Sequence, residues 1–171
     1  FALLYVLLGL GHFLLIKDGA DRLLMTSIAW GSAAVFGGAW RALMVWRPCN
    51  SCAHKAALMS GCIVLLNCLA HLYCTEEPEQ STNIALVIIG TGCVFLSKRW
   101  WVVFVSITLA GWLAVGYAVG PKLLLPHYAF AQLTALLLSA TVMLVRIRTY
   151  GKLFDSRASE AERAFEMEVA L

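Results

Sequence analysis

The feature that most constrains this chain is a series of six long apolar runs, separated by short stretches that contain charged residues or proline. The runs cover residues 1–16, 22–46, 56–75, 82–97, 100–120 and 126–146. A helix that crosses a bilayer needs about 20 mostly apolar residues, and lipid offers no partner for an unpaired backbone group. The runs therefore predict an all-α polytopic membrane protein, folded as a bundle of six transmembrane helices.

The composition excludes an ordinary soluble domain. Of the 171 residues, 61% are hydrophobic and only 13% are charged, and the mean hydropathy is +0.79. Six spans would use roughly 120 residues, which leaves room for short loops and a tail but not for a separate soluble domain. The first run has no basic flank and no small-residue cleavage site after it, which argues against a signal peptide.

Loop charge predicts how the bundle is oriented. One side carries most of the basic residues: Arg41, Arg47, Lys55, Lys98, Arg99, Arg146, Arg148 and Lys152. The other side has fewer bases set among acids: Lys17, Arg22 and Lys122 with Asp18, Asp21, Glu76, Glu77 and Glu79. Because basic loops stay in the cytoplasm, both termini are expected inside and the acidic turn at residues 76–80 outside.

After the sixth run, at about residue 149, the sequence changes character, and residues 150–171 are predicted to form a short cytoplasmic amphipathic linker helix. Gly151 is expected to loosen the exit from the membrane, and Ser159 with Glu162 matches a capping box. One helical stripe is apolar and consists of Phe154, Ala158, Ala161 and Phe165. That stripe suits either a helix on the membrane surface or a linker that pairs with a second copy.

Three histidines are predicted to share one depth near the outer face. His12 lies near the outer end of the first run, His71 near that of the third, and His127 at the outer start of the sixth. Three imidazoles suit zinc or copper, and two suit the axial positions of haem b. The alternative is that each ring lies separately at the interface and bonds to a carbonyl or to water.

The third run carries a polar stripe. Asn67, His71 and Cys74 are four and three residues apart, and so they share one helical face. We expect Asn67 either to bond to a neighbouring helix or to orient His71. Ser81 and Thr82 are expected to cap the next helix.

The loop after the second run contains Cys49, Cys52 and His54, which together suggest a redox or metal loop. A single CxxC pair is not a closed zinc site, because such a site needs four ligands, although two loops in a dimer would supply them. The chain has no phosphate-binding loop, nucleophile elbow, HExxH motif or paired intramembrane carboxylates. We therefore expect no enzymatic activity from these residues.

Several segments carry a resemblance to a known group: GHFLL (11–15), NCLAHLYCTEEPEQSTN (67–83), LSKRWWVVFVSITLAGWLAVGYAVGP (96–121) and PHYAFAQLTALLLSATVMLVRIR (126–148). The chain resembles the six-span N-terminal sensor region of bacterial signalling proteins, such as the histidine kinases of two-component systems, diguanylate cyclases and nucleotide cyclases. That resemblance implies an input domain in the bacterial inner membrane, dimeric with a second copy and joined to a cytoplasmic output domain, with no nucleic acid partner.

The resemblance also implies an outer-face site for a small ligand or metal. The matching positions are His12, Asn67, His71, Glu77, Pro78, Gln80, Thr82, Asn83 and His127. The CxxC loop is not part of that pattern. Two alternatives remain open at this point: a membrane electron-transfer protein that binds haem or a metal, and an accessory subunit of a larger membrane complex.

Overall fold

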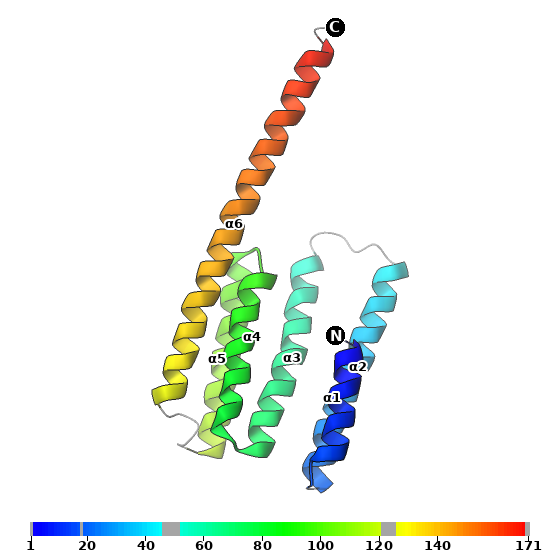
Figure 1. Cartoon of the computed structure of the whole chain (residues 1–171), viewed down its shortest axis with the longest axis vertical. Helices are drawn as coiled ribbons and strands as arrows, with labels where there is room; N and C mark the ends of the chain where they lie inside the picture. Colours follow the sequence, from blue (N-terminus) through cyan, green and yellow to red (C-terminus); the bar gives the residue numbers. More distant parts are fainter. Residues whose placement is uncertain (1, 18, 46–51, 121–125, 170–171) are drawn as a thin grey trace.

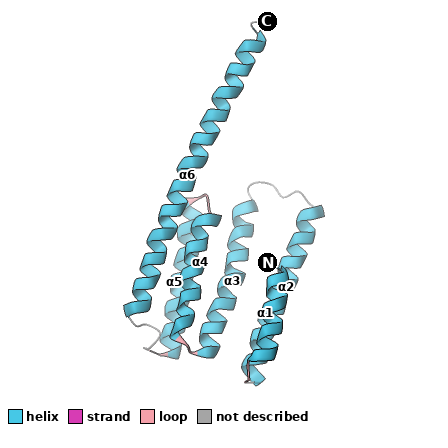
Figure 2. Ribbon diagram, in the orientation of Figure 1, coloured by secondary structure: helices cyan, strands magenta, loops and turns pink. Residues whose placement is uncertain are grey.

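The computed structural model describes residues 2–17, 19–45, 52–120 and 126–169, apart from a few side chains within helices. The described residues are almost all helical and contain no strand, which confirms the all-α class (Figures 1 and 2). The elements are α1 (Ala2–Leu15), α2 (Gly19–Val45), α3 (Ala53–Thr75), the short 3-10 helix η2 (Pro78–Gln80), α4 (Ser81–Val94), α5 (Lys98–Val119) and α6 (Pro126–Val169).

Four of these helices are long and apolar enough to cross a membrane: Gly19–Ala42 in α2, Ala53–Thr75, Lys98–Val119 and Pro126–Arg163 in α6. Helices α1 and α4 have 14 residues each, or about 21 Å of helical rise, which is shorter than the hydrocarbon core of about 30 Å. Length and composition thus indicate a membrane protein. The described part of the chain contains four full-length candidates, and so the count of six spans is not confirmed.

The helices run up and down side by side (Figure 1). We call the end from which α6 projects the tail end. We call the opposite end, where α1 leads into α2 and α3 leads into α4, the turn end. The strongly basic positions at the start of α5 and in α6 lie at the tail end, and the acidic turn between α3 and α4 lies at the turn end.

Helix α6 is longer than the sequence predicted. It does not end near residue 146 but continues through Gly151 as one helix of 44 residues, or about 66 Å. A glycine inside a helix costs only about 1 kcal/mol relative to alanine, so it does not have to end the helix. Ser159 consequently lies inside the helix, where its hydroxyl donates to the carbonyl of Ser156 instead of forming a capping box.

The surface of the bundle is largely apolar, whereas several polar side chains are buried within it. Leu15 is 80% exposed and Tyr117 is 88% exposed, but Thr108 and Ser139 are fully buried. Large contiguous apolar surface is rare on soluble monomers, and hydrogen bonds between buried polar groups are a common means of helix association in lipid. This distribution agrees with a chain that lies in a membrane.

Hydrogen bonds across helices join α4, α5 and α6. Ser139 on α6 shares a bond of 3.0 Å with Thr91 on α4 and accepts a bond of 2.9 Å from the indole of Trp101 on α5. Nearer the turn end, the hydroxyl of Ser81 accepts from Trp112, and its carbonyl accepts from Gln132. Ser81 therefore joins three helices and does not cap α4, which begins after Gln80 with no side-chain cap.

The contact between α4 and α6 is unusually close. Gly92 faces the backbone of Ser139, and a Cβ atom added at Gly92 would overlap the carbonyl oxygen of Ser139. The guanidinium of Arg146 donates to the carbonyls of Gly92 and Cys93 at the end of α4. Gly92 therefore allows the two helices to approach closely.

Helices α4, α5 and α6 form one unit of the bundle, and helices α1 and α2 form a second. Tyr5 and Phe36 stack with ring centroids 5.6 Å apart and planes 10° from parallel, and Trp30 packs directly over Gly9. Helix α3 lies between this pair and α4, and it contacts α2, α4 and α5. The bundle therefore consists of the α1–α2 pair on one side of α3 and the α4–α5–α6 group on the other (Figure 1).

Candidate functional site

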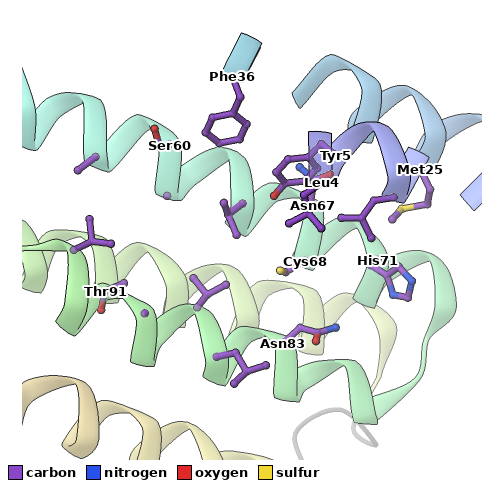
Figure 3. Close-up of a pocket in the computed structure, with 18 of the residues that line it drawn as sticks. Leu4, Tyr5, Met25, Phe36, Ser60, Asn67, Cys68, His71, Asn83 and Thr91 are labelled. Carbon is purple, nitrogen blue, oxygen red and sulfur yellow. The ribbon is translucent and has the colours of Figure 1, made fainter. Parts of the chain in front are cut away.

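A cavity of about 780 Å³ lies where the two units meet, and its walls come from α1, α2, α3 and α4 (Figure 3). Apolar side chains form most of the lining. The polar or ionisable groups include His12, His71, Asn67 and Asn83 toward the turn end, and Thr91 and Ser60 toward the tail end. None of the lining residues is Lys, Arg, Asp or Glu. The cavity is thus long, largely apolar and free of formal charge, except where histidine is protonated.

Two of the three predicted histidines meet at the turn end of this cavity. The ring centroids of His12 on α1 and His71 on α3 are 5.7 Å apart, with the planes at 40°. The Nδ1 atom of each ring is buried and has no hydrogen-bond partner. An unpaired buried nitrogen costs roughly 1–3 kcal/mol, so this pair is a natural place for a ligand that supplies a partner.

The third histidine is not part of this pair. His127 is exposed on α6 and lies edge-on against Tyr128 at 5.3 Å between ring centroids. Within the described ranges, no group of three or more His, Cys, Asp or Glu side chains could hold a metal ion. The predicted three-histidine zinc or copper site is therefore not formed, because α6 packs on the far side of α4 from α1 (Figure 1).

Asn67 joins two helices in the wall of the cavity. Its Nδ2 donates to the hydroxyl of Ser32 on α2 at 2.8 Å and to the carbonyl of Ile63 at 2.8 Å. This is the first of the two roles expected for Asn67, a bond to a neighbouring helix. Cys68 lies beside it in the cavity lining, and His71 is reached one turn further along α3.

The acidic turn is connected to the cavity through side-chain amides. Gln80 donates to Glu77 at 3.2 Å, and Asn83 donates to Gln80 at 2.8 Å. Thr82 is exposed and does not line the cavity, and its hydroxyl donates to the carbonyl of Glu79. Of these turn residues, which the resemblance implied, Asn83 lines the cavity. Gln80 and Glu77 do not line it but are linked to Asn83 by hydrogen bonds.

The CxxC loop is described only in part. Cys49 lies outside the described residues, and Cys52 is exposed at the start of α3. His54 stacks on Trp100 of α5, with ring centroids 6.5 Å apart and planes at 17°. This imidazole is packed against an aromatic ring at the tail end, away from the His12–His71 pair at the turn end.

Sequence reasoning missed the residues that connect the cavity to α6. Thr91 lines the cavity and also shares its hydroxyl bond with Ser139. Ser139 lies in a leucine-rich run between Thr134 and Thr141, and hydroxyl residues in such a run are the signal that would have pointed to interhelical bonds.

Comparison with known proteins found nothing similar: no protein-family model, no curated protein and no solved structure matches the chain. Function is therefore inferred from the cavity and from the helices around it.

Proposed function

We propose that this chain is a membrane sensor domain, in which a small ligand binds the cavity near the His12–His71 pair and α6 passes the resulting change to a cytoplasmic output domain. The observation that carries this proposal is that Thr91 contacts both the cavity and α6. It lines the cavity on α4 and bonds to Ser139 on α6. A wall of the cavity is thus in direct contact with the helix that leaves the bundle.

The mechanism is a shift of the α4–α5–α6 group between two packings against α3 and the α1–α2 pair. Helix α4 is held to α6 by Thr91, by the Gln132 bond to Ser81, and by Arg146 at its end. A ligand that moves α4 therefore moves α6 with it. To change the signal, the ligand must bind one packing better than the other by about 1–3 kcal/mol.

The proposed setting is the bacterial inner membrane, with the tail end in the cytoplasm. The described basic residues of the tail end support this orientation, since basic segments stay on the cytoplasmic side. Helices α1 and α4 would complete a six-span bundle as shorter segments. The output domain would follow the tail of α6, as the resemblance implies, and these residues would bind and transmit without catalysing a reaction.

A second copy of the chain is the proposed partner of α6. Phe154 is 70% exposed in the charged part of the helix, and Ala158 and Ala161 continue the same stripe; the side chain of Phe165 lies outside the described part. Arg157 and Glu162 flank this stripe, at the positions where parallel coiled coils form ion pairs between helices. Two copies in one membrane have parallel tails, so each Arg157 would face the partner's Glu162.

Cysteine cross-linking tests this pairing. In a background without the six native cysteines, Ala161→Cys is expected to form a disulfide-linked dimer in membranes on mild oxidation. Ser156→Cys, on the opposite face of the same helix, is the matched control and should remain monomeric. Equal cross-linking at both positions would reject a defined seam.

The signalling role is tested with a reporter enzyme fused after Leu171. Inserting one to four alanines after Ser156 rotates the reporter by about 100° per residue, whereas inserting seven restores the phase. We expect reporter output to vary with the insertion length and to return to its starting level at seven. Output that is the same for every insertion would refute transmission through α6.

The His12–His71 pair favours a second candidate, a membrane electron-transfer protein with haem b held by these two rings. Bis-histidine haem gives a strong Soret absorbance band. Purified protein from cells supplied with haem would show that band, and His71→Ala would remove it. A preparation without the band rejects this candidate and leaves the sensor proposal standing.

A further inference from the structure

We propose that the ligand of the cavity is a lipid-soluble molecule with an uncharged, hydrogen-bonding head and a hydrocarbon body, which enters from the bilayer between α1 and α4. This inference rests on the sensor function proposed above and names the chemical class that the site would take.

The charge of the lining selects an uncharged head. A carboxylate, phosphate or ammonium buried in an apolar cavity requires an opposite charge beside it. None of the lining residues is Lys, Arg, Asp or Glu. A hydroxyl or carbonyl needs only a hydrogen bond, and the lining offers the imidazoles of His12 and His71 and the amide of Asn83.

The position of these polar groups sets the direction of the ligand. The imidazole Nδ1 atoms of His12 and His71 are buried and unpaired, so a head group at the turn end would supply the missing partner. Along α3 the lining extends from Ala57 to His71, about 21 Å at 1.5 Å per residue. The walls beyond the head include Leu8, Val64 and Val87, which suits an extended hydrocarbon body.

The mouth of the cavity faces the lipid side. Leu4 on α1 is 52% exposed, and Leu86 and Val94 on α4 are 64% and 56% exposed, although all three line the cavity. Gly90 lies between the two α4 residues, and a Cβ atom added there would meet nothing within 4 Å. Helix α1 packs chiefly on α2, so the gap toward α4 is bordered by apolar side chains and no charge.

Photolabelling in phosphatidylcholine nanodiscs tests the class of head group. Three probes carry the same diazirine-bearing hydrocarbon chain and differ in the head: an alcohol, a carboxylate at pH 8 and a benzoquinone. We expect the alcohol or the benzoquinone to label α3 and α4 saturably and at least fivefold more than the carboxylate. Stronger labelling by one of these two identifies the source as an alkyl alcohol or a quinone, and either result supports the proposal.

Gly90→Phe is the blocking variant, because Gly90 lines the mouth and has free space at its Cβ position for a larger side chain. We expect it to reduce saturable labelling at least fivefold. Gly31→Phe, on an exposed face of α2 that also has free space, is the matched control and should label like the parent protein. His71→Phe removes the hydrogen bond to the head and serves as the second test if Gly90→Phe does not fold.

Equal labelling by the carboxylate and the alcohol, no saturable labelling by any probe, or labelling unchanged in both Gly90→Phe and His71→Phe would overturn the inference. These results are separate from the reporter experiment. If the probes label without selectivity for the uncharged heads but reporter output still depends on the phase of α6, only the ligand class is rejected. If reporter output does not depend on the phase of α6, the sensor function is rejected, whatever the labelling result.

Discussion

The two sides of the bundle are held together by different means. The α4–α5–α6 group combines a glycine contact with a network of buried hydroxyl, indole and amide groups, centred on Ser81 and Ser139. The α1–α2 pair is joined internally by aromatic packing, and its side-chain hydrogen bonds to α3 include those of Ser32 with Asn67 and of Asp21 with Cys74. The cavity lies on the side where the attachment is weaker.

This difference indicates which part moves. In lipid there is no strong hydrophobic force between helices, so close packing and interhelical hydrogen bonds decide how firmly they associate. The α4–α5–α6 group has both, and we expect it to move as one body. The α1–α2 pair can then open or close over the cavity at small cost, and the following substitutions would test that contrast.

The largest effect is expected from Gly92→Leu. Its side chain would overlap the backbone of Ser139, and a helix backbone cannot yield as a flexible side chain does. We expect a loss of stability of at least about 3 kcal/mol or a failure to fold, measured by thermal unfolding in detergent. Gly90→Leu, two residues away in open space, is the control, and equal losses in the two variants would contradict the close contact.

Ser139→Ala should have the next largest effect. It removes the acceptor of the Trp101 indole and the bond to Thr91, whose hydroxyl keeps its bond to Ile88, and we expect a cost of about 1–2 kcal/mol. Thr141→Val is the matched control, because its hydroxyl is exposed and bonds only to Leu137 of its own helix. A melting temperature lowered equally by both changes would argue against the network.

Tyr5→Leu tests the α1–α2 pair itself. Loss of the stack on Phe36 is expected to cost about 1 kcal/mol. Tyr5→Phe keeps the ring and should retain most of the stability. Near-ultraviolet circular dichroism in detergent measures the loss of the aromatic environment together with the shift in melting temperature. If Tyr5→Phe is as unstable as Tyr5→Leu, the stack is not the source of the stability.

The smallest change in stability is expected from Asn67→Leu, about 0.6 kcal/mol, typical of interhelical hydrogen bonds in membrane proteins. Its effect on opening should be larger, because it removes the bond between Asn67 and Ser32 that joins α3 to α2 in the wall of the cavity. We expect a maleimide to react with Cys68 severalfold faster, while exposed Cys93 reacts at its usual rate. An unchanged Cys68 rate would mean that this bond does not hold the cavity closed.

The sequence predicted the helices well and the site in part. Apolar runs broken by charge and by Pro78 located each helix, because lipid leaves the backbone little choice but helix. Position along a run also gave the common depth of His12 and His71. It could not say which helices are neighbours, and so His127 was wrongly grouped with them although α6 lies beyond α4.

The cavity itself could not be predicted from the sequence. It depends on how far the α1–α2 pair stands from α4, and residues such as Leu86 and Gly90 look like ordinary span residues in the chain. The end of α6 was predicted too early because Gly151 and the change in composition resemble a helix stop. In the structure, α6 continues through Gly151, because the residues on both sides of this glycine favour helix.

In the proposed six-span bundle, the short length of α4 has a consequence for the surrounding lipid. Its 14 residues fall about 9 Å short of a typical hydrocarbon core, and Arg146 brings a positive charge to its tail end. This hydrophobic mismatch is relieved when the adjacent bilayer thins and head groups follow the guanidinium inward. The position of α4, and of α6 with it, should therefore respond to acyl-chain length, and thicker membranes should displace the same group of helices that a ligand would move.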